Sequence, residues 1–182
     1  MEKRPHIIIF NPDEMRYDGM GHMGNPAAVT PFLDRFAKEE AVSFRYAFCQ
    51  NPVCVPSRCS FFTGLYPHVH GHRTMSYLLH PGEENLFSEL KEAGYHIWMN
   101  ARNDLFAGQV LGWAESNADE IFYGGDIPAP PGPECDKKGE KDKYSHFEGR
   151  LKLDEDGRNY NGDDEGVDAA IRHLNAYGGE KP

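Results

Sequence analysis

Apolar and polar positions alternate in short blocks along this chain, and the blocks predict strands interleaved with helices. Residues 6–10 form a compact, β-branched apolar run that a proline and an acid soon follow. This pattern is typical of a strand buried in a parallel sheet. Residues 41–47 and 96–100 form two further apolar runs, so we expect two more strands there.

Apolar side chains recur at helical spacing over residues 31–40, which predicts a helix. Thr30 occupies the expected N-cap position. Pro31 takes the first helical position, where the backbone N–H that proline lacks would make no intrahelical hydrogen bond. The apolar face of this helix consists of Phe32, Leu33, Phe36 and Ala37.

Two more segments, residues 86–93 and 165–177, also predict helices. Gly94 ends the first of them, and Asp163 or Asp164 caps the second. Strands and helices that alternate in this way predict an α/β fold with a mostly parallel central sheet flanked by helices.

Residues 126–149 are rich in proline, glycine and charge, which predicts a long loop or excursion rather than a second domain. The formal net charge of −10 argues against nucleic acid or an anionic membrane surface as a partner. An anionic substrate must therefore be attracted by a local positive site. The chain shows neither an apolar signal region before its first strand nor a run long enough to span a bilayer, so we expect a cytoplasmic location.

The most informative segment, residues 54–64, reads Cys-Val-Pro-Ser-Arg-Cys-Ser-Phe-Phe-Thr-Gly. Pro56 suits the first turn of a helix, which places Cys54 at or just before the helix N-terminus. Unpaired N–H groups and the helix dipole favour an anion there. Arg58, about one turn further along the helix, adds a planar guanidinium that is always positively charged. The segment predicts an anion site that contains a nucleophile; the alternative is that Cys54 is a small buried apolar residue.

Two acids, Asp13 and Glu14, follow the first predicted strand. The carboxyl ends of parallel strands are where open α/β sheets bind ligands, and carboxylates suit a hard cation such as Ca²⁺ or Mg²⁺. A solvated turn is the alternative.

Three histidines, His68, His70 and His72, alternate along the chain after this segment. In an extended stretch they would share one side and could bind a transition metal, but we favour pocket lining or hydrogen bonding. The four cysteines lack both zinc-site spacing and the density of a disulfide scaffold.

Residues 54–58, followed by Thr-Gly-Leu-Tyr-Pro-His at residues 63–68, resemble the signature of the type I, formylglycine-dependent sulfatases of the alkaline-phosphatase-like superfamily. The resemblance implies an alkaline-phosphatase-like α/β sandwich and hydrolysis of a small-molecule sulfate ester. It also implies that a formylglycine-generating maturation enzyme reads Pro56 and Arg58 and oxidises Cys54 to formylglycine. In the family this resemblance points to, Arg58 then stabilises the hydrated aldehyde at residue 54.

The same resemblance implies a divalent metal, calcium by preference and Mg²⁺ or Mn²⁺ otherwise, bound by Asp13, Glu14 and the modified Cys54. It places His70 near the nucleophile. In the implied mechanism one hydroxyl of the formylglycine hydrate attacks sulfur and expels the alcohol, and the second hydroxyl collapses to the aldehyde and releases sulfate.

Residues 94–104 align with a family segment that supplies a lysine and a histidine to the sulfate. This chain has Arg102 at the lysine position and Asp104 at the histidine position. Arg102 can pair with a sulfate oxygen, whereas Asp104 cannot act as a cationic ligand. The alternatives are a surface ion pair for Arg102 and a turn cap for Asp104.

The family places a further catalytic histidine, a second pair of metal ligands and a C-terminal subdomain beyond the point where this sequence stops. We therefore expect residues 1–182 to be the N-terminal part of a sulfatase catalytic domain. An exposed sheet edge would favour association into a homo-oligomer. Two alternatives stay open: a phosphonate monoester or phosphate diester hydrolase of the same superfamily, and an inactive truncated half-site.

Overall fold

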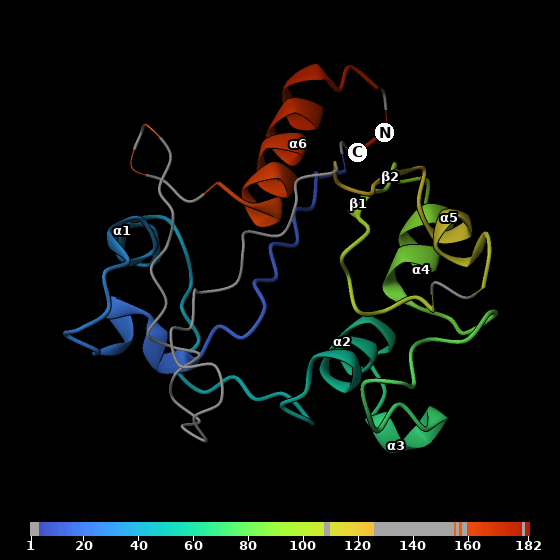
Figure 1. Cartoon of the computed structure of the whole chain (residues 1–182), viewed down its shortest axis with the longest axis horizontal. Helices are drawn as coiled ribbons and strands as arrows, with labels where there is room; N and C mark the ends of the chain where they lie inside the picture. Colours follow the sequence, from blue (N-terminus) through green and yellow to red (C-terminus); the bar gives the residue numbers. More distant parts are fainter. Residues whose placement is uncertain (1–3, 108–109, 126–154, 156, 158–159, 180) are drawn as a thin grey trace, which may run out of the picture.

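The computed structural model describes residues 4–107, 110–125, 155, 157, 160–179 and 181–182, and every structural statement below concerns those residues. In Figure 1, α1 and two short 3-10 turns lie on one side of the molecule, and α2 to α5 gather with a small sheet on the other. The elements in chain order are η1 (Tyr17–Gly19), η2 (Gly21–Met23), α1 (Pro31–Glu39), α2 (Cys54–Thr63), α3 (Pro67–His70), α4 (Leu86–Glu92), β1 (Trp98–Asn100), α5 (Trp113–Asn117), β2 (Glu120–Phe122) and α6 (Gly162–Ala176).

The hydrophobic core lies between α2, α4, α5 and the sheet. Phe62 of α2 stacks on Phe87 of α4, with ring centroids 4.7 Å apart. The buried apolar side chains of the core are Val55, Cys59, Phe62, Leu79, Ile97, Met99, Leu105, Phe106 and Ala118. Because three of these side chains belong to α2, removing the core from water also fixes that helix in place.

The sheet consists of β1 and β2, which pair in parallel with Trp98 opposite Glu120 and Asn100 opposite Phe122. The predicted strand over residues 96–100 is confirmed at its last three residues. Met99 is buried at the centre of β1, and α5 provides the helical crossover between the strands. The described residues therefore contain a small parallel sheet flanked by helices, and they do not form the full expected sandwich.

The strands predicted at residues 6–10 and 41–47 are wrong, because neither segment pairs with another strand among the described residues. A strand exists only where a neighbour accepts and donates its backbone hydrogen bonds, and an apolar run cannot supply that neighbour. The expected burial also fails, since Ile8 is 71% exposed and Phe10 is 74% exposed.

The helix predicted at residues 31–40 is confirmed as α1, with Pro31 at its start. Thr30 holds the N-cap position, but its hydroxyl accepts a hydrogen bond from the Gly21 N–H and donates one to Asp34, so it does not cap the backbone. The apolar face is not buried: Phe32 is 62% exposed and Phe36 is 41% exposed. These two rings stack on each other at 6.1 Å instead of entering the core.

The other predicted helices are confirmed with small shifts. The helix expected at residues 86–93 is α4, and Gly94 follows it with φ +87. The last helix, α6, begins earlier than residue 165, because Asn161 and not an aspartate is the N-cap. Asp164 completes a capping box by accepting from the Asn161 N–H at 2.9 Å.

Two further expectations concern less regular parts of the chain. The loop predicted at residues 126–149 lies outside the described residues. The extended stretch predicted for the three histidines is wrong, because Pro67–His70 forms the short helix α3, which Pro67 can initiate. Within the described ranges, no helix combines the length and apolar character that crossing a bilayer requires.

Candidate active site

The start of α2 places Cys54 as the sequence predicts. Val53 is extended (φ −115, ψ 139), and its carbonyl accepts the first helical hydrogen bond, from the Ser57 N–H at 2.9 Å. Cys54 is therefore the first residue of the helix, and Pro56 lies buried in the first turn. Cys54 itself is half-buried, beside backbone N–H groups that the helix leaves unpaired.

Arg58 lies one turn along α2 and connects two carboxylates from distant parts of the chain. Its Nη1 is 3.2 Å from Asp13 Oδ1 and 3.2 Å from Asp104 Oδ2, and its Nη2 is 3.3 Å from Asp13 Oδ1. The Arg58 side chain is only 12% exposed, whereas those of Asp13 and Asp104 are 51% and 38% exposed. The largely buried Arg58 guanidinium is thus held by ion pairs with Asp13 and Asp104.

Asp13, Cys54 and Asp104 form a possible cation site, because one ligand atom from each lies within 4.8 Å of the others. The two carboxylates carry more negative charge than Arg58 neutralises, and carboxylate oxygens suit a hard divalent cation. A thiolate is a soft ligand, so the set fits calcium or magnesium better once oxygen replaces the sulfur at residue 54.

Asp104 is the functional candidate that sequence reasoning undervalued. It stands where the resembling family has a histidine and cannot act as a cationic sulfate ligand, yet it pairs with Arg58. Glu14 and Asp104 are the non-glycine residues with positive φ in the described chain, at 52° and 51°. Strained backbone of this kind clusters at functional sites. No local sequence pattern predicts the contact between Asp104 and Arg58, because the two residues lie 46 positions apart in the sequence.

Cys54 and Cys59 show why only one of the two thiols is a candidate nucleophile. Burial raises the pKa of the Cys59 thiol to about 12, and the nearby Glu83 charge adds to the rise, so Cys59 stays protonated within the core. The Cys54 thiol instead donates to the thioether of the exposed Met75 at 2.9 Å. A thioether is a weak acceptor, so this contact leaves the Cys54 sulfur available for chemistry.

The structure does not bring the other predicted site residues into this cluster. Glu14 is exposed and contributes no ligand atom to it. Arg102 forms an exposed ion pair with Asp163 at 3.4 Å, and His70 Nδ1 lies 2.9 Å from Glu83 Oε1. The roles assigned to Glu14, Arg102 and His70 stay predictions.

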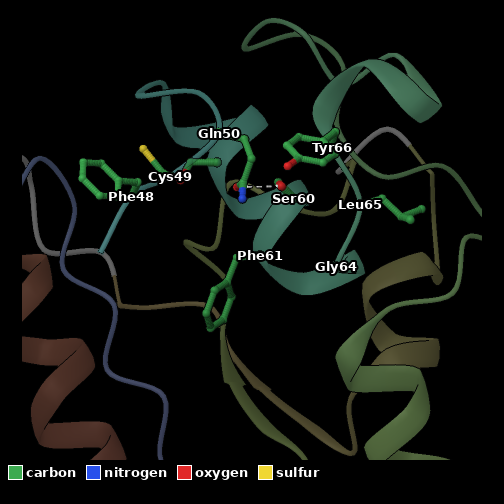
Figure 2. A pocket seen from close by; sticks show the side chains of 9 residues that line it. Phe48, Cys49, Gln50, Ser60, Phe61, Gly64, Leu65 and Tyr66 are labelled. Carbon is green, nitrogen blue, oxygen red and sulfur yellow. Dashed lines mark hydrogen bonds between the residues drawn. The ribbon is translucent and has the colours of Figure 1, made fainter. Parts of the chain in front are cut away.

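A hollow of about 360 Å³ lies against another part of α2, and Figure 2 shows the side chains around it. Ser60 donates a hydrogen bond to Gln50 across it at 2.9 Å. The lining residues are Phe48, Cys49, Gln50, Ser57, Ser60, Phe61, Gly64, Leu65 and Tyr66. Because Cys54 and Arg58 are absent from the lining, this hollow is separate from the possible cation site formed by Asp13, Cys54 and Asp104.

Comparison with known proteins gives consistent matches. The model of the family described as Sulfatase matches residues 5–149. The chain is 39% identical over 94 residues to an ulvan-active sulfatase of Formosa agariphila, and the aligned segment covers 51% of this chain and 18% of that protein. It is 36% identical over 94 residues to an arylsulfatase of Clostridium perfringens, covering 51% of this chain and 19% of that protein. It is 35% identical over 104 residues to human N-acetylgalactosamine-6-sulfatase, covering 50% of this chain and 20% of that protein. The chain thus spans about a fifth of the length of these curated relatives.

Proposed function

The chain belongs to the sulfatase family, and from this premise we propose that it supplies part of an active site that hydrolyses a small-molecule sulfate ester. The observation that carries the proposal is the position of Cys54 at the N-terminus of α2, with Arg58 one turn along between two carboxylates. The relatives named ulvan-active sulfatase, arylsulfatase and N-acetylgalactosamine-6-sulfatase support the reaction class and leave the alcohol portion open.

We assign the nucleophile to Cys54 after its oxidation to formylglycine by a maturation enzyme. The half-buried position at the start of a helix supports this role, since backbone N–H groups there stabilise the charge of an incoming sulfate. A formylglycine hydrate carries two hydroxyls on one carbon, so one would attack sulfur as the alcohol leaves, and the other would then lose its proton to reform the aldehyde as the C–O bond to sulfate breaks. A serine or cysteine ester lacks that second group.

We assign the metal ligands to Asp13 and Asp104, with the oxygen of the modified residue 54 as a third. A bound calcium ion, or Mg²⁺ or Mn²⁺ in its place, would offset negative charge on the sulfuryl oxygens. Arg58 has a positioning role toward both carboxylates and a direct role toward the sulfate, because its guanidinium has several donors.

The test of the nucleophile is the mass of the tryptic peptide that covers residues 46–58, prepared from protein co-expressed with a formylglycine-generating enzyme. We expect the sulfur of Cys54 to be replaced by oxygen while Cys49, in the same peptide, still reacts with a thiol reagent. Cys49 is exposed and therefore serves as an internal control for the reagent. Two intact thiols would overturn the assignment and favour the inactive half-site.

The test of the reaction class is turnover of an aryl sulfate compared with a phenyl phosphonate by the protein that carries these residues. A preference for the sulfate is expected. A preference for the phosphonate would assign the protein to the phosphonate and phosphodiester hydrolases of the superfamily. The variant Cys54→Ala should abolish either activity.

A further inference from the structure

Two histidines and a glutamate converge where α6 meets the small sheet, on residues that the proposed active site does not use. His96 precedes β1, Glu120 is the first residue of β2, and His173 lies in the last turn of α6. His96 Nε2 is 2.9 Å from Glu120 Oε1, and His173 Nδ1 is 3.5 Å from Glu120 Oε2. One ligand atom from each of the three residues lies within 4.8 Å of the others.

This donor set matches a zinc-class cation better than it matches calcium. Imidazole nitrogen and carboxylate oxygen are both common zinc ligands, whereas calcium prefers oxygen alone. Ligands at about 2.0–2.2 Å from a tetrahedral ion lie about 3.4 Å from one another. The two nitrogen–oxygen contacts of 2.9 and 3.5 Å are close to that spacing, and because all three ligand atoms lie within 4.8 Å of one another, side-chain rotation can bring them around an ion.

A carboxylate, that of Asp119, lies behind His96 at ion-pair distance and beyond the reach of a direct hydrogen bond. His96 Nδ1 lies 4.0 Å from Asp119 Oδ2, on the opposite side of the ring from the nitrogen that faces Glu120. Asp119 is itself held, because the Ile97 N–H donates to its Oδ2 at 2.8 Å. A carboxylate that accepts a hydrogen bond from a ligating histidine fixes its tautomer and raises its affinity for metal, and Asp119 lies on the side of the His96 ring where that bond would form.

Aromatic packing holds both imidazole rings while leaving one approach open. His173 stacks against Trp98 at 5.6 Å and Tyr177 at 5.3 Å, and against His96 at 5.9 Å. The side chains of His96 and His173 are 19% and 17% exposed, whereas that of Glu120 is 52% exposed. An ion can therefore enter past the glutamate and keep a water molecule as its fourth ligand.

We propose that His96, Glu120 and His173 bind a divalent cation of the zinc class, and that the ion joins α6 to the sheet. α6 already contacts the segment after β2, since the Gly125 N–H donates to Glu165 Oε1 at 2.8 Å. The cation adds a further connection near the other end of the helix, where His173 already stacks on Trp98 of β1.

The experiment is a calorimetric titration of Zn²⁺ into the full chain, stripped of metal with a chelator and carrying Cys54→Ala so that the candidate thiol cannot bind. We expect one tight site. His173→Ala and Glu120→Gln should each weaken zinc binding at least about tenfold, because loss of a ligand costs no less than loss of a supporting residue. His68→Ala is the matched control and should leave affinity unchanged, since that exposed ring only stacks on Tyr66.

Two further readouts make the result independent of folding defects. Glu120→Gln keeps the shape of the side chain, so it tests the site even if His173→Ala fails to fold. Co²⁺ bound in place of zinc should give visible absorption without a sulfur-to-metal charge-transfer band. Absence of a zinc site in the Cys54→Ala chain, or full affinity in Glu120→Gln, would overturn the proposal and leave an ordinary network of histidine–carboxylate contacts.

Discussion

Two regions of the chain contain similar apolar side chains but differ in burial: residues 4–50 leave theirs exposed, whereas residues 54–122 pack many of theirs into the core. In the second region Phe62, Phe87 and Phe106 interlock, with ring centroids 4.7 and 5.9 Å apart along the series. In the first region no residue is buried, and Phe44 and Phe48 are 72% and 84% exposed. Apolar content alone therefore does not form a core; partners from distant parts of the chain must close around it.

The contrast matters for the candidate active site because that site draws on both regions. Cys54, Arg58 and Asp104 belong to the packed region, and Asp13 belongs to the exposed one. Asp13 reaches the others through its ion pair with Arg58. Cys54 and Arg58 are thus held by the helix that the core fixes in place, whereas Asp13 depends on its pairing with Arg58.

The largest expected effect comes from paired substitutions of phenylalanine in the two regions. Phe62→Ala should destabilise the protein by about 3–5 kcal/mol, because the ring is 8% exposed and its loss leaves a cavity. Phe44→Ala should change stability by no more than about 0.5 kcal/mol. Chemical denaturation of both variants measures the difference, and equal losses would show that residues 4–50 also pack into a core.

The next effect concerns the arginine that joins the two regions. If the proposed function holds, Arg58→Ala should lower kcat/KM for a sulfate ester about tenfold to a hundredfold, since a charge-assisted hydrogen bond contributes about 1.5–3 kcal/mol. Arg16→Ala is the matched control, because Arg16 also pairs with an aspartate, Asp18 at 2.6 Å, but its side chain is 80% exposed. Exposed pairs of that kind contribute about 0–1 kcal/mol. Equal activity in the two variants would argue against a role for Arg58.

The helices could be predicted from the sequence because their signals are local. Pro31 and Pro56 mark helix starts, and Gly94 marks a stop, each within a few residues of the element that it ends or begins. The strands at residues 6–10 and 41–47 could not be predicted in the same way. Their existence depends on hydrogen-bonding neighbours that an apolar run does not encode.

The candidate site shows the same division. The sequence predicts Cys54 and Arg58 through a motif, and Asp13 through a strand that the described residues do not form, yet the structure brings the three side chains together. It does not identify Asp104, whose value comes from a contact across 46 residues. In the separate histidine–glutamate cluster, the sequence does not identify His173, which lies in α6 and contacts Glu120 of β2.

The buried Cys59 makes the stability of the packed region depend on pH in the alkaline range. Cys59 has a pKa raised to about 12, so its neutral form stabilises the fold below the unfolded thiol pKa near 9. That stability should fall by about 1.4 kcal/mol per pH unit as the pH rises from about 9 toward 12. Denaturation at pH 8 to 10.5 should show the loss in the wild type, and Cys59→Ala, though less stable, should lack that slope.

A thiol reagent at neutral pH tests the same difference without denaturation. Cys49, exposed in the first region, should react at once, whereas Cys59 should react only after unfolding. Rapid labelling of Cys59 in the native protein would mean that the core opens readily, and would contradict its assignment to the packed region.

The smallest expected effect lies within the exposed region, at the carboxylate that joins η2 to α1. Slight burial acts to raise the pKa of Asp34, but hydrogen bonds from the His22 N–H and the Thr30 hydroxyl outweigh it and hold that pKa below its usual value. A lowered carboxylate pKa stabilises this junction above the unfolded pKa, and the contribution is lost as the pH falls through the lowered value. Asp34→Asn should therefore speed hydrogen exchange in α1 near neutral pH and leave α2 and α4 unchanged. Faster exchange in α2 would show that the two regions fold as one cooperative unit, and the contrast between them would then be one of packing alone.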